Sequence, residues 1–402
     1  MKAPRLARSP LSPALLVVGV ILVSINLRPA AASVGPVLDR IQSDTGLSSG
    51  WAGALATLPV LCFGLLAPLA PPLARRLGVH TAIAVALIAL TAGLLVRLIG
   101  GNVLLFAGTA LAGAAIAIGN VLMPVLVRRD FPDRTGTAMA LYTTALIGFA
   151  ALAAGVTVPI ADAFGGGWRP GLGVWAIPAA IAAVAWLPAF LRRDADAGAE
   201  ARAGAHAPTV RPILRQPLAW QVTLFFAVQS GGFYSTLAWL PDIFRSHGAG
   251  DSQAGFLLSL SIVVGLLTST TVPGLATRVR DQRWLVVACS AVWAAGLVGI
   301  LVAPMSAPYL WAVLLGLGQN STFPLALMLI VLRGGSLATT EGLSTLSQSV
   351  GYALAAVFPL AVGALHGAAG SWTPALILLL ALLVPQVGFG LAAGRNRQLA
   401  PA

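Results

Sequence analysis

The sequence predicts an all-α polytopic membrane protein with twelve transmembrane helices, arranged as two six-helix halves related by a parallel repeat. Three observations support this fold class. Of the 402 residues, 58% are hydrophobic and only 9% are charged, whereas soluble domains carry roughly 25% charged residues. Apolar windows of about 20 to 26 residues recur from end to end. The two halves of the chain also share motifs at similar offsets.

Twelve apolar windows are long enough to cross a bilayer as helices. In chain order they cover residues 13–37, 51–73, 79–99, 103–127, 135–160, 172–191, 218–240, 253–276, 284–303, 308–332, 340–365 and 373–393. The polar stretch between the sixth and seventh windows is rich in Ala and Gly, which is typical of a flexible linker. We therefore expect an N-terminal half over residues 1–191, a cytoplasmic linker over 192–215 and a C-terminal half over 216–402.

The basic residues indicate how the helices are oriented. With the N-terminus assigned to the cytoplasm, only Arg40, Arg97, Arg169 and Arg245 fall in loops on the opposite side. Arg28 lies inside the first window, and every other Lys or Arg falls on the cytoplasmic side, as the positive-inside rule requires. We therefore expect a multi-pass protein of a bacterial inner membrane with both termini in the cytoplasm.

Composition and residue placement exclude several classes of function. A net charge of +12 would suit nucleic acid, but the basic residues lie between apolar windows and are not clustered with aromatics. Cys62 and Cys289 are far from any metal-ligand spacing, so we expect no metal site and no cofactor. All His, Asp and Glu fall in loops or at window ends with no buried acid–base pair, so an enzyme is not expected.

The most informative charged residue is Arg28, near the middle of the first window. A guanidinium at mid-membrane costs about 3 kcal/mol and cannot be titrated away. In a structural interpretation, Arg28 binds carbonyls exposed by Pro29 or reaches toward an interface. Because no carboxylate is expected within the spans to neutralise the charge, we favour an anionic or strongly polar ligand as its partner.

Further polar residues at mid-depth accompany Arg28. Amides carry donors and acceptors, so several together can bind a small polar solute. Each amide can instead join neighbouring helices. The predicted substrate-binding residues are Arg28, Asn26, Asn120, Gln229, Tyr234, Gln319, Asn320, Gln348 and Tyr352. The predicted cavity-lining aromatics are Phe233, Trp239 and Phe323.

One carboxylate has a predicted conformational role. Glu341 is expected to begin the eleventh helix, where a negative side chain suits the positive end of the helix dipole. There it could pair with Arg333 or another cytoplasmic arginine and latch one conformation. We do not expect any carboxylate to carry a coupling proton.

Motifs repeat between the two halves. Asn120-Val-Leu-Met-Pro124 in the fourth window matches Asn320-Ser-Thr-Phe-Pro324 in the tenth. A repeat of this kind places a binding site near the membrane midplane, where polar residues on facing helices meet a solute from either side.

Two six-helix halves around a long linker resemble the major facilitator superfamily over essentially the whole chain. Within it, seven segments are similar to the cyanate and 2-nitroimidazole transporter family: 26–29, 33–36, 120–124, 128–132, 238–241, 323–324 and 348–352. The resemblance implies alternating access by rocking of the halves, with the first, fourth, seventh and tenth helices lining the cavity. In the loop after the second helix, where the superfamily usually has an acidic residue, this chain has Arg75 and Arg76 but no carboxylate.

We therefore expect a secondary active transporter for a small anionic or strongly polar solute, cyanate-like or nitro-heteroaromatic. The alternative is a multidrug-type exporter of small neutral or weakly acidic aromatics. A channel would need a continuous polar lining, which these Ala-, Leu- and Val-rich helices do not supply. The expected partners are the small-molecule substrate and the lipid bilayer, with no nucleic acid, and the protein is expected to be a monomer.

Overall fold

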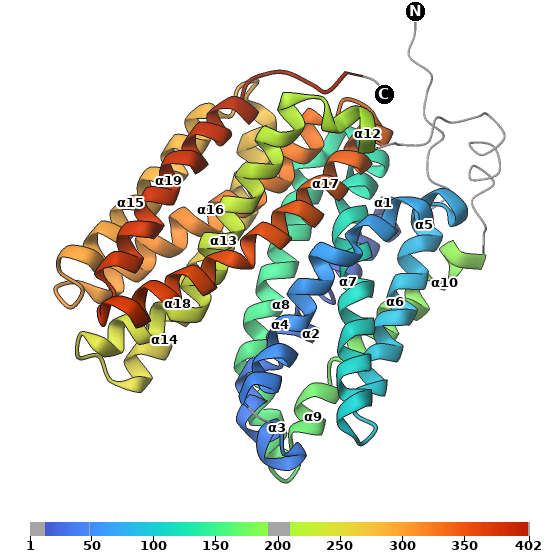
Figure 1. Ribbon diagram of the computed structural model, residues 1–402. Coiled ribbons are helices and arrows are strands. Elements are labelled where there is room, and N and C mark those ends of the chain that lie inside the picture. The colour runs from blue at the N-terminus through green and yellow to red at the C-terminus, as the bar shows by residue number, and fades with distance from the viewer. Residues whose placement is uncertain (1–12, 48, 192–209, 401–402) are drawn as a thin grey trace, which may run out of the picture.

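The computed structural model describes residues 13–47, 49–191 and 210–400, and the elements in these ranges are α-helices and short 3-10 helices (Figure 1). Most of the expected linker, 192–215, lies outside the described residues. Its last part forms the short helix α12 (Val210–Leu214).

The N-terminal half makes its first, second and sixth crossings from more than one helical piece. Its elements are α1 (Pro13–Ser24), α2 (Pro29–Ala32), η1 (Gly35–Val37), α3 (Leu38–Thr45), α4 (Ser49–Leu66), η2 (Ala67–Leu69), α5 (Ala70–Leu77), α6 (Val79–Val96), α7 (Asn102–Asp130), η3 (Pro132–Arg134), α8 (Thr135–Ala163), α9 (Trp168–Gly173) and α10 (Ala176–Leu191).

The C-terminal half has longer, more continuous helices. Its crossings are α13 (Pro217–Ser246), α14 (Asp251–Arg278), α15 (Arg283–Val302), α16 (Pro308–Arg333), α17 (Leu337–Ala355) with α18 (Val357–Ala369), and α19 (Thr373–Ala393). The shared motif occupies the fourth helix of each half, α7 and α16, as the repeat predicts.

Within the described part of the chain, eleven helical segments are long and apolar enough to cross a membrane. The remaining predicted crossing corresponds to α13, which has 30 residues and packs against α14 and α16 to α19. Its polar residues Thr223, Gln229 and Ser230 are buried, so they face other helices and not lipid. Helix α13 therefore completes the twelve-helix fold.

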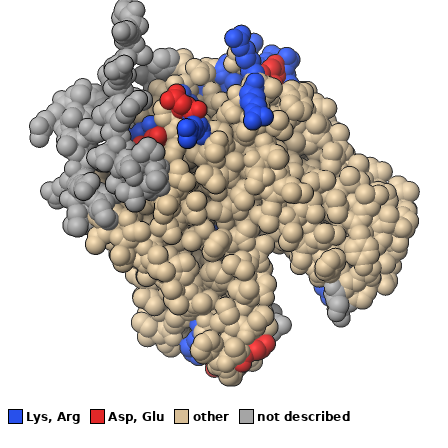
Figure 2. Space-filling model, turned by 180° about the vertical axis from the view of Figure 1, so that it is seen from behind, with Lys and Arg blue, Asp and Glu red and all other residues tan. Residues whose placement is uncertain are grey.

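The two halves meet on the side where α17 begins and α19 ends, which we call the termini side, and diverge on the opposite side (Figure 1). Across the boundary, α4 and α7 pack against α17, and α8 packs against α14. Figure 2 shows a deep notch between two lobes on the side away from the termini, which we call the cleft. The apolar core of the described residues consists of one large cluster and two smaller ones. The large cluster contains residues of both halves, and each smaller cluster lies within one half.

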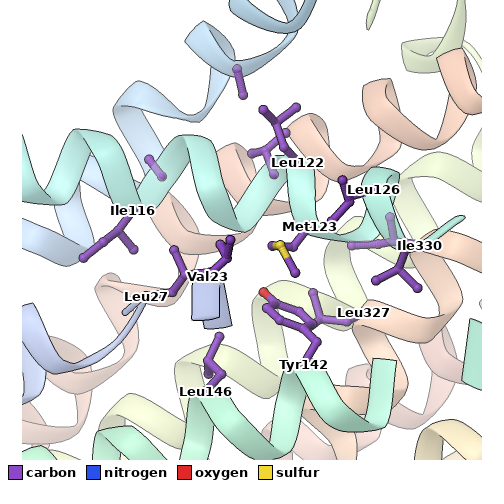
Figure 3. Close-up of a cluster of buried hydrophobic side chains, with 14 of the residues drawn as sticks. Val23, Leu27, Ile116, Leu122, Met123, Leu126, Tyr142, Leu146, Leu327 and Ile330 are labelled. Atoms are coloured by element: carbon purple, nitrogen blue, oxygen red, sulfur yellow. The ribbon is translucent and has the colours of Figure 1, made fainter. Parts of the chain in front are cut away.

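The shared cluster seals the side opposite the cleft. Met123 and Leu126 of α7 lie close to Leu327 and Ile330 of α16, with Tyr142 of α8 beside them (Figure 3). All five side chains are buried. Separating the halves on this side would therefore expose apolar surface and break interdigitated packing.

The first crossing is interrupted at residues 25–28, immediately before Pro29. Proline has no N–H, so the carbonyl of Ile25 loses the donor that a continuous helix would supply. Helix α1 ends at Ser24, α2 begins at Pro29, and Arg28 is the residue that caps α2, with φ −124° and ψ −34°. The helix is thus broken at the residue that carries the charge.

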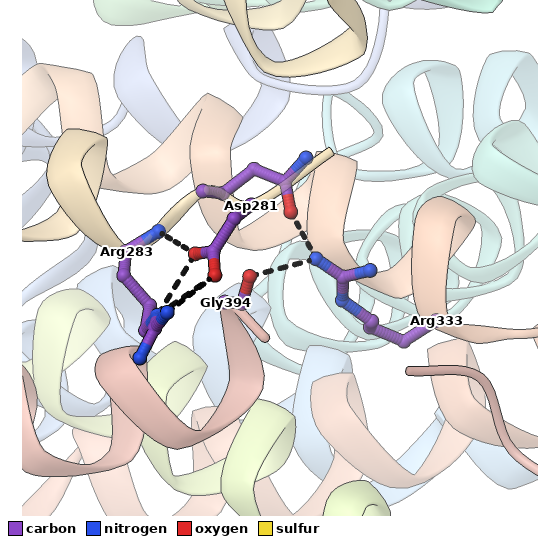
Figure 4. A network of polar contacts seen from close by, with 5 residues as sticks. Asp281, Arg283, Arg333 and Gly394 are labelled. Carbon is purple, nitrogen blue, oxygen red and sulfur yellow. Dashed lines mark hydrogen bonds and ion pairs between the residues drawn. The ribbon is translucent and has the colours of Figure 1, made fainter. Parts of the chain in front are cut away.

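A polar network joins helix ends of the C-terminal half on the termini side (Figure 4). Arg333, at the end of α16, donates to the side-chain oxygen of Gln282 and to the carbonyl of Gly394. Asp281 accepts hydrogen bonds from the side chain and the backbone N–H of Arg283, and these bonds hold the pKa of its carboxyl below the usual range. Arg333 is therefore buried and connects the end of α16 to Gln282 and Gly394, although the sequence analysis placed it in a loop.

Two glycines of α16 let neighbouring backbones approach closely. A Cβ on Gly318 would lie 2.2 Å from the backbone nitrogen of Trp293 in α15. A Cβ on Gly316 would lie 2.3 Å from the carbonyl oxygen of Ser261 in α14. Backbone atoms cannot rotate aside, so a larger residue at either position would push helices apart.

We expect Gly318→Ala to lower the free energy of unfolding by about 1–3 kcal/mol, because the added methyl group overpacks the α15–α16 contact. Gly274→Ala in α14 is the matched control, since a Cβ there meets nothing within 4 Å. Thermal unfolding of both purified variants in detergent checks the prediction. Equal midpoints for the two variants would contradict the close approach of α15 and α16.

Candidate functional site

Arg28 lies at the boundary between the two halves and binds the C-terminal half. Its Nη1 donates to the hydroxyl of Tyr234 at 2.9 Å, and its Nη2 donates to the hydroxyl of Tyr352 at 3.3 Å. Tyr234 is on α13 and Tyr352 is on α17. Three residues that the sequence analysis selected from separate spans are thus brought together across the halves.

Aromatic rings surround this guanidinium. The Cζ atom of Arg28 lies 5.9 Å from the ring centroid of Phe63 and 5.5 Å from that of Phe323, within reach of a cation–π interaction. Phe323 was predicted to line the cavity. Phe63 was not, because a phenylalanine in an apolar span carries no signal that separates it from a core residue. We call Arg28, Tyr234, Tyr352, Phe63 and Phe323 the Arg28 cluster.

The Arg28 cluster offers hydrogen-bond donors around a single positive charge. Arg28 is partly buried, and its hydrogen-bond partners among the described residues are neutral hydroxyls. A tyrosine hydroxyl that accepts from Arg28 keeps its own O–H to donate. An anion beside Arg28 would therefore receive charge-assisted bonds from the guanidinium and further bonds from the two tyrosines. In the described part of the chain, no three His, Cys, Asp or Glu side chains are placed to hold a metal ion.

Comparison with known families agrees with the fold. Residues 17–356 match the Major Facilitator Superfamily. The chain belongs to this superfamily. Among solved members, the transporter FucP in its outward conformation aligns with a TM-score of 0.71 at 14% identity, over 95% of this chain and 98% of that one.

Three relatives within the superfamily are transporters by name. The uncharacterized transporter YycB of Bacillus subtilis (strain 168) is 41% identical over 386 residues, 96% of this chain and 94% of that protein. The 2-nitroimidazole transporter of Escherichia coli (strain K12) is 36% identical over 384 residues, 96% of each. The cyanate transport protein CynX of the same strain is 31% identical over 355 residues, 88% of this chain and 90% of that protein. The predicted family resemblance is confirmed.

This superfamily member has a buried histidine–carboxylate contact close to its second loop. Gly78 ends α5 with a φ of 81°, and two residues later the Nε2 of His80 lies 3.0 Å from Oδ2 of Asp130, at the end of α7. The two side chains are only 5% and 1% exposed. The expectation that the chain has no buried acid–base pair is therefore wrong. Both residues do lie at helix ends, as expected, but those ends pack against each other.

Four of the predicted site amides make hydrogen bonds within their own half. Asn26 donates to the carbonyls of Leu22 and Pro178, Gln229 to the carbonyl of Phe226 and the hydroxyl of Ser230, Gln319 to the hydroxyl of Thr236, and Asn320 to the carbonyls of Ser261 and Gly316. In this conformation the nitrogens of Asn26, Gln319 and Asn320 join helices of one half, whereas that of Gln229 bonds within α13. These hydrogen bonds do not include the Arg28 cluster.

Asn120 and Gln348 lie at a contact between the halves. The Nε2 of Gln348 on α17 donates to the backbone carbonyl of Asn120 on α7 at 2.7 Å. Gln348 is one turn from Tyr352, on the side nearer the termini. The side-chain amide of Asn120 is buried and has no hydrogen-bond partner among the described residues, so it remains available to a ligand or a water molecule.

The predicted cavity aromatics other than Phe323 are in two places. Phe233 packs edge-on against Tyr234, with ring centroids 5.4 Å apart, and so adjoins the Arg28 cluster. Trp239 donates from its indole nitrogen to the carbonyl of Pro359 and packs 5.6 Å from Trp372. Trp239 belongs to the apolar cluster that is confined to the C-terminal half, and the structure does not bring it to Arg28.

Glu341 is buried in the second turn of α17, not at its start. The helix begins at Leu337, earlier than predicted, because Ser336 and Thr339 form a capping box over its first N–H groups. Glu341 therefore lies beyond the first turn, in which the helix dipole stabilises a negative charge. Its role as a latch stays a prediction.

We expect Asn320→Ala to lower the free energy of unfolding by about 1 kcal/mol for each hydrogen bond lost, because its amide joins α16 to α14. Asn120→Ala is the repeat-matched control. Its amide makes no hydrogen bond to the described residues, so truncation should change stability little. Thermal unfolding of the two variants without ligand measures the difference, and a larger loss for Asn120→Ala would contradict these assignments.

Proposed function

We propose that this chain is a secondary active transporter that moves a small anionic or strongly polar solute across the bacterial inner membrane by alternating access. The observation that carries the proposal is the environment of Arg28, a partly buried cation with neutral hydrogen-bond partners. An uncompensated charge within the membrane is costly. A bound anion would neutralise the charge of Arg28 and so remove that cost.

The other buried arginines support this interpretation by contrast. Arg97 donates to the carbonyls of Ala30 and Leu172, both at 3.0 Å, and Arg333 donates to the carbonyl of Gly394. These carbonyls lie at helix ends or interruptions, where intrahelical donors are lacking. Arg97 was expected in a loop but is buried because it satisfies them. Arg28 makes no such carbonyl contact among the described residues, so the N–H groups that it does not donate to Tyr234 and Tyr352 can bind a solute.

The position of Arg28 between the halves supports alternating access. Arg28 belongs to the N-terminal half, whereas the two tyrosine hydroxyls belong to the C-terminal half. A ligand bound by all three groups contacts both halves at once. Its binding energy can therefore favour closure of the cleft around it, which is the step that precedes opening on the other side.

We propose that the termini face the cytoplasm and that the cleft opens outward. Figure 2 shows most of the visible Lys and Arg side chains on the termini side, as the positive-inside rule requires. The protein then works as a monomer, with halves 1–191 and 216–402 rocking about the solute and residues 192–215 joining them.

The named relatives support a substrate class. One is a 2-nitroimidazole transporter and another a cyanate transport protein. Cyanate is a small linear anion, and a nitroimidazole is a planar ring whose nitro oxygens carry partial negative charge. Both present oxygen acceptors that a guanidinium and two hydroxyls can bind, so we propose a solute of this size and polarity.

A second candidate function is export of small neutral or weakly acidic aromatics. The rings of Phe63 and Phe323 near the guanidinium favour it, because offset or edge-on ring contacts can hold a planar solute without a charge. The two candidates differ in what Arg28 contributes. Charge is essential for an anion and dispensable for a neutral aromatic.

We expect Arg28→Lys to fold but to bind the solute at least tenfold more weakly, because an ammonium is a point charge and cannot reproduce the planar donor fork. The purified protein is first screened by thermal unfolding against cyanate, other small anions and nitro-heteroaromatics. A ligand at 100 times its Kd stabilises the native state by about 2.7 kcal/mol. The best ligand is then titrated against wild type and Arg28→Lys, and counterflow of the labelled compound is measured in vesicles.

Arg245→Lys is the matched control, because Arg245 is exposed beside Asp242, about three helical turns beyond Tyr234 in α13. It should bind and transport like wild type. Normal binding and counterflow in both Arg28→Lys and Arg28→Gln would disprove the anion site. Stabilisation by neutral aromatics that survives in Arg28→Gln would favour the exporter instead.

A further inference from the structure

Two helix prolines leave backbone carbonyls without a partner in their own helix at the boundary between the halves. A proline has no N–H for the carbonyl four residues earlier. Pro124 in α7 thus releases the carbonyl of Asn120, and Pro273 in α14 releases the carbonyl of Ser269. We call these two groups the released carbonyls.

Both released carbonyls accept a hydrogen bond from the opposite half. Gln348 on α17 donates to the carbonyl of Asn120 at 2.7 Å. The hydroxyl of Thr143 on α8 lies 2.9 Å from the carbonyl of Ser269 and shares its single proton with two carbonyls of its own helix. The two bonds lie in two separate contacts between the halves, α7–α17 and α8–α14, which we call seams.

These contacts are shielded from water and have polar neighbours in the same seams. Gln348 is 1% exposed and Thr143 is 0% exposed. Ser344, one turn from Gln348, donates to the carbonyl of Val121 at 2.8 Å. In the other seam the hydroxyls of Thr144 and Ser269 are 3.1 Å apart. When the halves separate here, the released carbonyls lose the donors that the described residues give them and must be hydrated.

We infer that the released carbonyls are two of the points at which hydrogen bonds hold the halves together on the termini side, beside the bonds that Ser344 and Arg128 donate across the boundary. Gln348 and Thr143 are then positioning residues that set the balance between the two facing states, and Gln348 acts on transport without touching the solute. This inference rests on the alternating access proposed above. Besides bending a helix, Pro124 and Pro273 would each leave one backbone carbonyl free to accept a hydrogen bond from the opposite half.

A proline in a helix has two effects, the kink and the released carbonyl, and two substitutions separate them. Pro124→Ala restores an N–H that the carbonyl of Asn120 can use in both facing states, so the state open on the termini side becomes less costly. Pro324→Ala in α16 is the repeat-matched control. It removes the same kind of kink, but its released carbonyl, at Asn320, accepts no hydrogen bond from the N-terminal half among the described residues.

The experiment measures how often the closed seams open. Two reporters are made separately, Ser344→Cys in the α7–α17 seam and Ser269→Cys in the α8–α14 seam, in full-length protein with the buried Cys62 and Cys289 replaced by Ala. Both serines are 0% exposed, so a water-soluble maleimide reacts only when the halves separate. The labelling rate is then proportional to the open population, even when that population is small.

We expect Pro124→Ala to raise the labelling rate about fivefold at both reporters, the ratio that corresponds to roughly one weakened hydrogen bond. Gln348→Met, which keeps the side-chain length and removes the donor, should do the same. The double variant should show no more than the larger single effect, because both changes act on one bond. Pro324→Ala should stay within twofold of the parent.

Three outcomes would overturn the inference while leaving the transporter assignment intact. These are an unchanged rate in Pro124→Ala, an equal increase in Pro324→Ala, and acceleration at Ser344→Cys alone, which would mean local fraying of α7. A parent chain whose reporters react only after denaturation would contradict alternating access itself. Thermal midpoints of all variants without ligand show whether a rate change reflects general loss of stability.

Discussion

The structure depends on one electrostatic constraint, a guanidinium that cannot be discharged and that sits where a membrane helix is broken. The interruption at residues 25–28 turns Arg28 away from a continuous helix and toward the other half of the molecule. Hydroxyl groups and ring faces then surround the charge without neutralising it. An anion bound as proposed would add charge-assisted hydrogen bonds to this charge.

A second constraint is that backbone groups inside a membrane need partners. Buried arginines and amides satisfy carbonyls at helix ends within each half, as Arg97 and Asn320 show. At the boundary the donors come from the opposite half, as Gln348 shows. Bonds of the first kind are kept in both facing states if the halves move as rigid bodies. Bonds of the second kind exist only while the seam is closed.

These two constraints assign different tasks to similar residues. Asn120 and Asn320 are equivalent in the repeat, but the amide of Asn320 joins α14 to α16, whereas the amide of Asn120 is not used by the described residues. The repeat is thus symmetric in fold and asymmetric in chemistry. An asymmetric site suits a small solute, since one half can carry the charge and the other the hydroxyl donors.

The sequence by itself determined the fold, because helix length, apolar composition and the placement of basic residues are local properties. Length and composition match the hydrocarbon core of a bilayer, and the basic residues set the orientation. It also singled out Arg28, since a charge within an apolar span stands out whatever surrounds it. The tertiary structure decided which neighbours completed the site. Tyr234 and Tyr352 reach Arg28, Trp239 does not, and Phe63 joins without any distinguishing signal. It also buried His80 against Asp130 at helix ends that looked exposed. Side-chain direction and the packing of helix ends depend on contacts between distant segments, and no local pattern encodes them.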